Sequence, residues 1–371
     1  MATAELILER EQESAQAWTL PAQIPELDGI RGLAILMVLV CHSAMWLPIG
    51  PARSVLIEGR IGVDLFFVLS GFLITGILLD TKGNRRALPK FYIRRGLRIW
   101  PLYFAFLVLA FGVMYKMVPP HLSPWAYILF VQNFFYVAGT GPMLDPTWSL
   151  AVEEQFYVVW PWIALRVKRE TVLKICCAVM MMSPLIRIVM RLIGASDEFV
   201  YANTFCRLDG IAMGGAIASW VRAEDFEIAR LRRFAQIGVF AGVTGTALCF
   251  RFASIPLATE LRYSFVTFAF GGIVAWTVAN QGSRIVLSNA LRNFTLTGLG
   301  KISFALYLFN LPIYTLMHGR LADRVFLSIP AQMSGISRLV VGNVVLLVAA
   351  AASWMLYESR ILRLKSKFAP R

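Results

Sequence analysis

A chain of 371 residues that is 58% hydrophobic, 13% aromatic and only 16% charged is too apolar for an ordinary soluble domain. Its formal net charge of +14 would suit nucleic acid in a soluble protein, but the basic residues lie mostly in short links between apolar segments, as topology determinants do. The five cysteines show no paired metal-binding spacing, so neither a disulfide framework nor a zinc site is expected. These features exclude nucleic-acid binding and indicate a polytopic membrane protein.

Apolar segments of about 20 residues, long enough to cross roughly 30 Å of hydrocarbon, follow one another along the chain. The first 28 residues carry several glutamates and no basic region before a cleavage site, so a polar cytoplasmic tail is expected there. The chain is predicted to be an all-α polytopic membrane bundle of about ten helices, with the membrane domain at 29–358 and a basic cytoplasmic tail at 359–371. The predicted spans are 30–48, 62–80, 99–118, 147–165, 171–193, 206–221, 234–252, 262–280, 300–318 and 338–357.

One further apolar segment, from Pro124 to Ala138, is short for a span and rich in aromatic residues. If this segment does not cross the membrane, every link assigned to the cytoplasm is net basic, whereas the outer link GASDEFVYAN is acidic. The positive-inside rule therefore favours ten spans with both termini in the cytoplasm.

Ionisable groups inside apolar segments are costly in lipid, so they are candidates for function. The first span contains Arg31 and His42, eleven residues apart. In a helix this spacing leaves them about 20° apart around the axis and roughly 16 Å apart along it, so they line one stripe. A histidine can give and take a proton near neutral pH. The alternative is that His42 makes only an interhelical hydrogen bond.

Three acidic residues are predicted at the depth of His42. Asp64 begins the second span, and Glu153 and Glu154 lie about two turns into the fourth. Together they form a candidate cluster for proton handling, although adjacent glutamates point about 100° apart, so at most one of them faces His42. In the alternative, the glutamates pair with arginines of later spans: Arg187, Arg191 or Arg207.

A basic motif, FYIRRGLRIWPLYF, precedes the third span. Arg94 and Arg98 share a helical face, with Arg95 beside it, at the predicted cytoplasmic boundary of the membrane. Arginine binds phosphate oxygens through two parallel hydrogen bonds and stays charged at physiological pH. The motif therefore suits a polyphosphate donor such as coenzyme A, and the alternatives are lipid headgroups or topology alone.

Five stretches appear in register: LDGIRGLAILMVLVCHS, GRIGVDLFFVLSGFLIT, FYIRRGLRIWPLY, TWSLAVEEQFYVVWP and CRLDGIAMGG. Together they resemble the bacterial membrane acyltransferase-3 family, which O-acylates envelope polysaccharides, nodulation factors and some antibiotics. The resemblance covers roughly residues 25 to 357. It implies a ten-span bundle in the bacterial inner membrane that moves an acyl group, commonly acetyl, from cytoplasmic acyl-CoA to a sugar hydroxyl.

The resemblance also implies roles for acidic and basic residues of the first, second and fourth spans. His42 is expected to be the catalytic histidine, with Arg31 as its companion in the first span. Glu153 matches the more constant acidic position, ahead of Glu154. Glu153 or Asp64 is then expected to orient His42 and to stabilise its charged form.

The donor is expected to be acyl-CoA, with acetyl-CoA as the expected form. The resemblance assigns their binding to Arg94, Arg95 and Arg98, and Arg31 is expected to assist. No metal is expected. The expected partners are membrane lipid and a carbohydrate or glycolipid acceptor.

One position departs from the family. Where the family usually has a histidine, in the stretch SFALYLFNLPI, this chain has Asn310, which can hydrogen-bond but cannot act as a general base. Asn310 and Glu154 are expected to contact the substrate or to support the site. Arg207 and Asp209 match a further polar pair of the family and are placed in the same group, without a particular role. A hydrolase-like domain after the last span is not expected, so acceptor capture is expected to rest on the membrane domain or on a separate periplasmic or biosynthetic partner protein.

Two other classes of function remain open. A secondary transporter or exporter of a small anionic or sugar-containing substrate also places carboxylates, histidine and arginines inside a helical bundle. A structural or lipid-organising membrane protein is disfavoured by His42, Glu153 and Asp64, which stability alone does not require.

Overall fold

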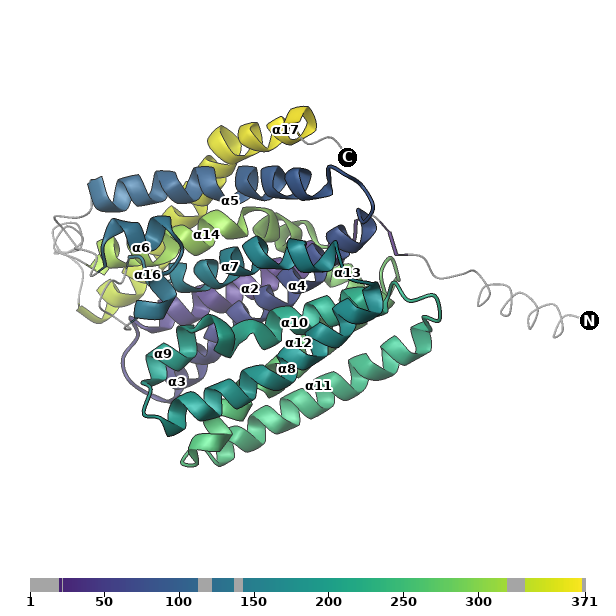
Figure 1. Cartoon of the computed structure of the whole chain (residues 1–371). Coiled ribbons are helices and arrows are strands. Elements are labelled where there is room, and N and C mark those ends of the chain that lie inside the picture. The colour runs from purple at the N-terminus through teal and green to yellow at the C-terminus, as the bar shows by residue number, and fades with distance from the viewer. Residues whose placement is uncertain (1–19, 22, 113–121, 137–142, 319–330, 369–371) are drawn as a thin grey trace, which may run out of the picture.

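The computed structural model describes residues 20–21, 23–112, 122–136, 143–318 and 331–368. Within these residues every regular element is a helix, and the long helices lie side by side in one bundle, which confirms the all-α fold (Figure 1). The helices are α2 Pro25–Ala44, α3 Pro51–Ile57, η1 Glu58–Ile61, α4 Gly62–Asp80, α5 Ala87–Gly112, α6 Pro124–Ile128, η2 Gln132–Phe135, α7 Thr147–Ala164, α8 Arg169–Leu192, α9 Asp197–Ala202, α10 Thr204–Trp220, α11 Ile228–Arg251, α12 Pro256–Ala279, α13 Val286–Leu291, α14 Phe294–His318, α16 Ala331–Ser353, η3 Trp354–Glu358 and α17 Ser359–Phe368.

Among the described residues, eight helical segments are long and apolar enough to cross a membrane. Each of the ten predicted spans overlaps a helix, but the count of about ten is not confirmed. The two segments that fall short are α7, whose apolar face is interrupted by the sequence EEQ, and α10, which has only 17 residues. Both helices are nevertheless well buried among the others, so their polar residues face protein rather than lipid.

Several boundaries differ from those predicted. Helix α2 begins at Pro25, before the predicted start at residue 30, because proline suits the first turn of a helix. Helix α5 begins at Ala87, so Arg94, Arg95 and Arg98 of the basic motif lie within its first half. Within its described residues, 124–136, the predicted non-crossing segment contains only the short helices α6 and η2, as expected for a piece that does not cross. The described part of the predicted basic tail, Ser359–Phe368, is helix α17, which packs against α5.

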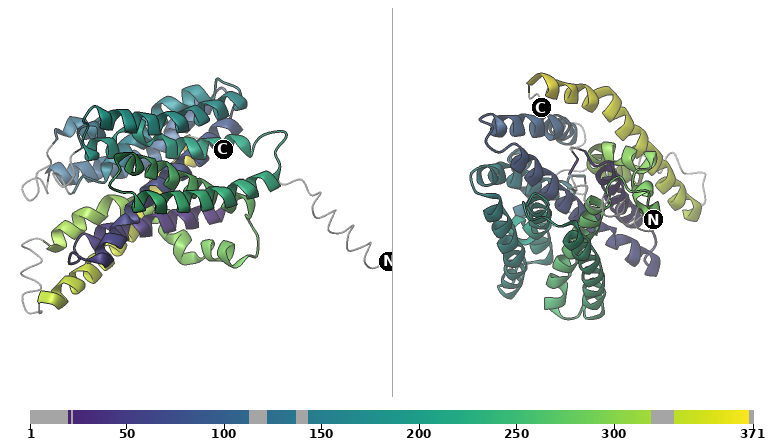
Figure 2. Two further views of the ribbon diagram at one scale, coloured as in Figure 1. Left: turned by 90° about the horizontal axis from the view of Figure 1, so that it is seen from below. Right: turned by 90° about the vertical axis from the view of Figure 1, so that its right-hand side faces the viewer.

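Helices α2, α4 and α14 occupy the middle of the bundle (Figure 1). Helices α5 and α17 lie on one side, and α11 and α12 lie on the opposite side, which the end-on view also shows (Figure 2). Because α2 carries Arg31 near its start and His42 near its end, we call the two ends of the bundle the Arg31 end and the His42 end.

Glycines allow α2 and α14 to lie in backbone contact. A Cβ atom added to Gly300 would lie 2.0 Å from the carbonyl oxygen of Asp28, and one added to Gly32 would lie 2.1 Å from that of Leu296. Any side chain at these positions would push the two helices apart. The contact therefore fixes the position of α14 along the axis of α2.

This packing predicts different effects for two glycines of α14. Gly300→Ala should destabilise the protein by about 1–3 kcal/mol, because the new methyl group overlaps the backbone of α2. Gly298→Ala is the matched control, since no atom lies within 4 Å of the added Cβ. Thermal unfolding of the purified protein in detergent measures both. Equal unfolding temperatures for the two variants would contradict this account of the contact.

Candidate active site

Three cavities follow one another from the Arg31 end to the His42 end. The entrance cavity, about 940 Å³, and the middle cavity, about 110 Å³, share Arg31 and Leu73 in their walls. The middle cavity and the His42 cavity, about 530 Å³, share Val63 and Tyr307. The shared wall residues place the three cavities next to one another along the bundle, with Arg31 at one end of the series and His42 near the other. We call this series of neighbouring cavities the path.

His42 forms a hydrogen bond with Asn310 of α14. Its Nδ1 lies 2.6 Å from Oδ1 of Asn310, whose side chain is completely buried. The amide nitrogen of Asn310 donates to the carbonyl oxygens of Leu306, at 3.0 Å, and Tyr307, at 2.7 Å. Carbonyl oxygens can only accept, so the NH₂ group of Asn310 faces these two carbonyls and its amide oxygen faces His42. Since an amide oxygen also only accepts, Nδ1 of His42 must donate to it. The remaining ring nitrogen, Nε2, then carries the lone pair that a general base needs.

The partner of His42 therefore differs from the one expected. The sequence suggests that Glu153 or Asp64 orients the imidazole, but the structure places Asn310 against it. A neutral amide fixes the tautomer of the ring without adding a negative charge beside it. The sequence signal for this contact is Asn310 itself, in the position where the family usually has histidine.

The two adjacent glutamates of α7 point to different neighbours, as adjacent helical residues must. Glu153 lines the middle cavity and accepts a hydrogen bond from the hydroxyl of Ser70. Glu154 is buried and accepts from the indole nitrogen of Trp100 at 2.9 Å. Glu153 thus lies among the cations of the middle cavity rather than against His42, and its catalytic role stays a prediction.

The arginines considered as partners for these glutamates are paired elsewhere. Arg191 pairs with Glu260 at 3.2 Å and also with Asp197. Arg207 and Asp64, both buried, form an ion pair of 2.6 Å between α10 and α4. Asp64 is therefore held by Arg207 and does not stand free beside His42.

The guanidinium group of Arg207 also supports a wall of the His42 cavity. It lies 4.5 Å from the ring centre of Tyr263, 5.3 Å from that of Tyr201 and 5.8 Å from that of Trp148. All three rings line the His42 cavity. A cation behind the rings attracts their faces, so the Asp64–Arg207 pair fixes the aromatic wall from behind.

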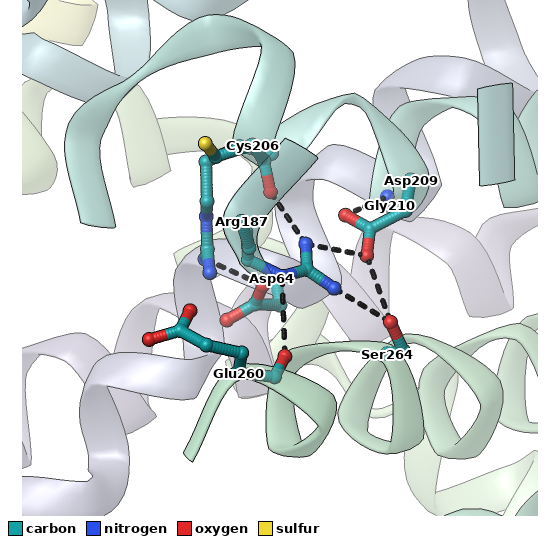
Figure 3. Close-up of polar contacts among 8 residues, drawn as sticks. Asp64, Arg187, Cys206, Asp209, Gly210, Glu260 and Ser264 are labelled. Atoms are coloured by element: carbon teal, nitrogen blue, oxygen red, sulfur yellow. Dashed lines mark hydrogen bonds and ion pairs between the residues drawn. The ribbon is translucent and has the colours of Figure 1, made fainter. Parts of the chain in front are cut away.

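Asp209 does not pair with Arg207, although the two residues are close in sequence. It pairs instead with the fully buried Arg187 of α8 at 2.9 Å. Figure 3 shows that Arg187 also donates to Ser264, at 2.6 Å, and to the carbonyl oxygens of Cys206 and Glu260. These bonds join α8, α10 and α12, so Asp209 belongs to a structural network beside the cavity.

The basic motif divides between the cavity and its surroundings. Arg95 and Arg98 line the middle cavity together with Arg31. Arg95 lies 4.9 Å from the ring centre of Tyr157, and Arg98 donates to the backbone carbonyl of Lys301 at 3.4 Å. Arg94 is half-buried and lines none of the three cavities. The structure thus brings three of the four predicted phosphate ligands together.

Two uncharged residues lie where the middle cavity meets the His42 cavity, and no pattern in the sequence marks them. The hydroxyl of Tyr307 lies 2.6 Å from that of Ser149 and donates to the carbonyl oxygen of Pro146 at 2.8 Å. Tyr307 lines both the middle cavity and the His42 cavity, and Ser149 lines the middle cavity. Tyrosine and serine in an apolar segment carry no charge signal, so only the fold reveals their position.

The fold and these cavities define a multi-pass membrane protein with neighbouring internal cavities, of which one is lined by Arg31, Arg95 and Arg98 and another by His42. The chain belongs to the family described as the acyltransferase domain, whose model matches residues 24–358. No solved structure matches the chain.

Similar curated proteins carry related names. The chain is 29% identical over 322 residues to the peptidoglycan O-acetyltransferase OatA of Listeria monocytogenes, covering 79% of this chain and 50% of that protein. It is 30% identical over 218 residues to the O-acetyltransferase OatA of Staphylococcus aureus, covering 53% and 35% of the two chains. It is 29% identical over 326 residues to the putative peptidoglycan O-acetyltransferase YrhL of Bacillus subtilis, covering 79% and 49%. The chain thus spans half the length of these relatives or less.

The Asp64–Arg207 contact predicts a loss of stability when the acid is removed. Asp64→Ala should cost about 3–5 kcal/mol, because it leaves a buried guanidinium without its counter-charge. Glu227→Ala is the control, since it breaks an ion pair with Arg230 in which both side chains are exposed, a change worth about 0–1 kcal/mol. Thermal unfolding in detergent compares them. An Asp64→Ala protein as stable as the unmodified one would contradict this structural role of Asp64.

Proposed function

We propose that the protein transfers an acetyl or another short acyl group from acyl-CoA to a hydroxyl group of a cell-envelope or exported carbohydrate. The observation that carries the proposal is the path of cavities that joins the cations Arg31, Arg95 and Arg98 to the basic nitrogen of His42. Membership of the acyltransferase family and the names of the relatives support the same reaction.

The donor would enter from the Arg31 end. Its phosphates would meet Arg31, Arg95 and Arg98, with Arg94 adding positive charge nearby, because guanidinium groups bind phosphate oxygens in pairs of hydrogen bonds. Arg31 and His42 are separated by roughly 16 Å along α2. An extended pantetheine arm bridges such a gap and would carry the thioester past Tyr307 towards His42.

The acceptor would bind in the His42 cavity. Aromatic side chains and charged groups share its walls, a combination that suits a polar ring with apolar faces. The relatives named for peptidoglycan make a cell-wall glycan a reasonable acceptor class. Asn310, Glu154, Arg207 and Asp209 would support the site by holding His42 and the surrounding helices in place.

In this mechanism Nε2 of His42 accepts the proton of the acceptor hydroxyl while the hydroxyl oxygen bonds to the thioester carbonyl carbon. The carbon–sulfur bond then breaks, and the CoA sulfur leaves and takes the proton back from the imidazolium group. A covalent route, in which the acyl group passes through Nε2, needs the same tautomer. Asn310 keeps Nδ1 protonated in both cases.

We further propose that the protein lies in a bacterial inner membrane with both termini in the cytoplasm. The basic links at the Arg31 end support this orientation through the positive-inside rule. It would present the cations to cytoplasmic acyl-CoA and the His42 cavity to the outer side. A separate partner protein could then receive the acyl group or deliver the glycan.

A path of cavities through the bundle also fits the alternative class, a secondary transporter. The two functions differ in what they require of the membrane. An enzyme transfers label from acetyl-CoA to a carbohydrate in detergent, whereas a transporter moves its substrate only across a sealed vesicle. Transfer in detergent with the purified protein therefore supports the acyltransferase, and uptake without transfer supports the transporter.

His42→Ala should lower acyl transfer by at least about 10²–10⁴-fold, because general-base catalysis is usually worth that factor. The measurement is transfer of radiolabelled acetyl groups from acetyl-CoA to cell-wall glycan fragments by the purified protein. The control is unchanged membrane insertion and thermal unfolding. Transfer at the unmodified rate without His42 would refute its catalytic role.

Asn310→Leu tests the tautomer. Removing the amide oxygen frees both ring nitrogens of His42 to carry the proton, so kcat should fall roughly tenfold or more while the KM for acetyl-CoA changes little. Asn310→Asp is the matched variant, because its carboxylate also accepts from Nδ1 and should retain more activity than leucine does. A larger loss in the aspartate variant than in the leucine variant would contradict this role.

A further inference from the structure

The walls of the entrance cavity carry more positive charge than negative charge. Two carboxylates, Asp28 and Asp80, stand against four basic side chains in these walls. The basic side chains are Arg31, Arg222, Arg292 and Lys301. An excess of cations around a cavity favours an anionic occupant.

The ion pairs show which cations remain available. Arg222 binds Asp80 through two hydrogen bonds of 2.6 and 2.7 Å. Arg292 binds the buried Glu26 at 3.0 Å. These two arginines are therefore largely neutralised by their own acids.

The other two cations are less well matched. The contact between Arg31 and Asp28 is 3.9 Å long, beyond hydrogen-bonding distance. Lys301 takes part in none of the ion pairs found within the described residues. Its exposed ammonium group is thus the cavity cation with the least compensation.

Lys301 is also held firmly at its place on the path. Its neighbour Gly300 packs directly on the backbone of Asp28, and its own carbonyl oxygen accepts the hydrogen bond from Arg98. Arg98 lines the middle cavity, and Arg31 lines both the middle and the entrance cavities. From the outermost position inwards, the cations therefore follow in the order Lys301, Arg31, Arg98.

We propose that Lys301 binds the 3′-phosphate of the coenzyme A donor in the entrance cavity. This inference rests on the proposed function. In acyl-CoA the thioester is followed by pantetheine, then the diphosphate and then the ribose with its 3′-phosphate. With the thioester near His42, the diphosphate reaches Arg31 and Arg98, and the 3′-phosphate lies beyond them at Lys301.

The chemistry of the two groups agrees with this order. A phosphomonoester carries a charge of about −1.5 to −2 near pH 7, which a compact ammonium group binds as a point charge. The less charged diphosphate oxygens suit the forked donors of arginine. The entrance cavity, about 940 Å³, is at the upper end of the usual size of a small-molecule site and has room for a nucleotide.

The test compares acetyl-CoA with 3′-dephospho-acetyl-CoA as donors for the purified, full-length protein in detergent. The unmodified protein should show a KM about tenfold higher for the dephosphorylated donor, because a charged contact of about 1.4 kcal/mol corresponds to that factor. Lys301→Gln should raise the KM for acetyl-CoA by a similar factor, leave kcat nearly unchanged and lose the discrimination between the donors. Lys301→Arg should retain the discrimination between the two donors.

Lys168→Gln is the matched control. Lys168 is an exposed lysine that directly precedes α8 at the same end of the bundle, and it lines none of the three cavities. The Lys168→Gln variant should show the same ratio of KM values for the two donors as the unmodified protein. Equal thermal unfolding of all variants excludes a folding defect.

Three results would overturn the inference or its basis, and they are distinguishable. If the unmodified protein transfers acetyl groups but Lys301→Gln still discriminates between the donors, the assignment of Lys301 is wrong while the proposed function stands. If the effect of Lys301→Gln appears only when anionic phospholipid is added, the ammonium group binds a lipid phosphate instead. If the unmodified protein uses neither donor, the proposed function itself fails.

Discussion

The backbone contact between α2 and α14 is the constraint on which the candidate site depends. Gly32 and Gly300 let the two helices touch near the Arg31 end, and from there both run towards the His42 end. This contact sets the position of α14 along the axis of α2. As a result, Asn310 lies against His42, and Lys301 lies beside the first turns of α2. A wider spacing would separate the imidazole from the amide oxygen that fixes its tautomer.

Buried ion pairs support this axis from the side. Asp64 and Arg207 join α4 to α10, and Arg187 and Asp209 join α8 to α10. Burying a charge inside a membrane protein costs free energy unless an opposite charge lies in direct contact with it. Here the two pairs surround the aromatic wall of the His42 cavity, so charges that resemble catalytic groups in the sequence act as its framework.

Most of the helices and several members of the site are predictable from the sequence. Apolar length locates all ten helical segments, and the i, i+11 spacing places Arg31 and His42 on one stripe, with Arg31 in the cation-lined cavities and His42 in its own. Local hydropathy does not fix the number of spans, because α7 is polar, α10 is short and both are buried by their neighbours. Burial by other helices is not encoded in local hydropathy.

The sequence by itself determined the solvent, the helices and the residue types available for chemistry, because these follow from composition and from spacing within one helix. Only the tertiary structure decided which charges meet. In the folded protein Asp64 forms an ion pair with Arg207, and Asn310 forms a hydrogen bond with His42. Lys301 and Tyr307 lie in the walls of the cavities. The physical reason is that ion pairs and cavity walls join helices far apart in the chain, and their pairing depends on how closely glycines let those helices approach.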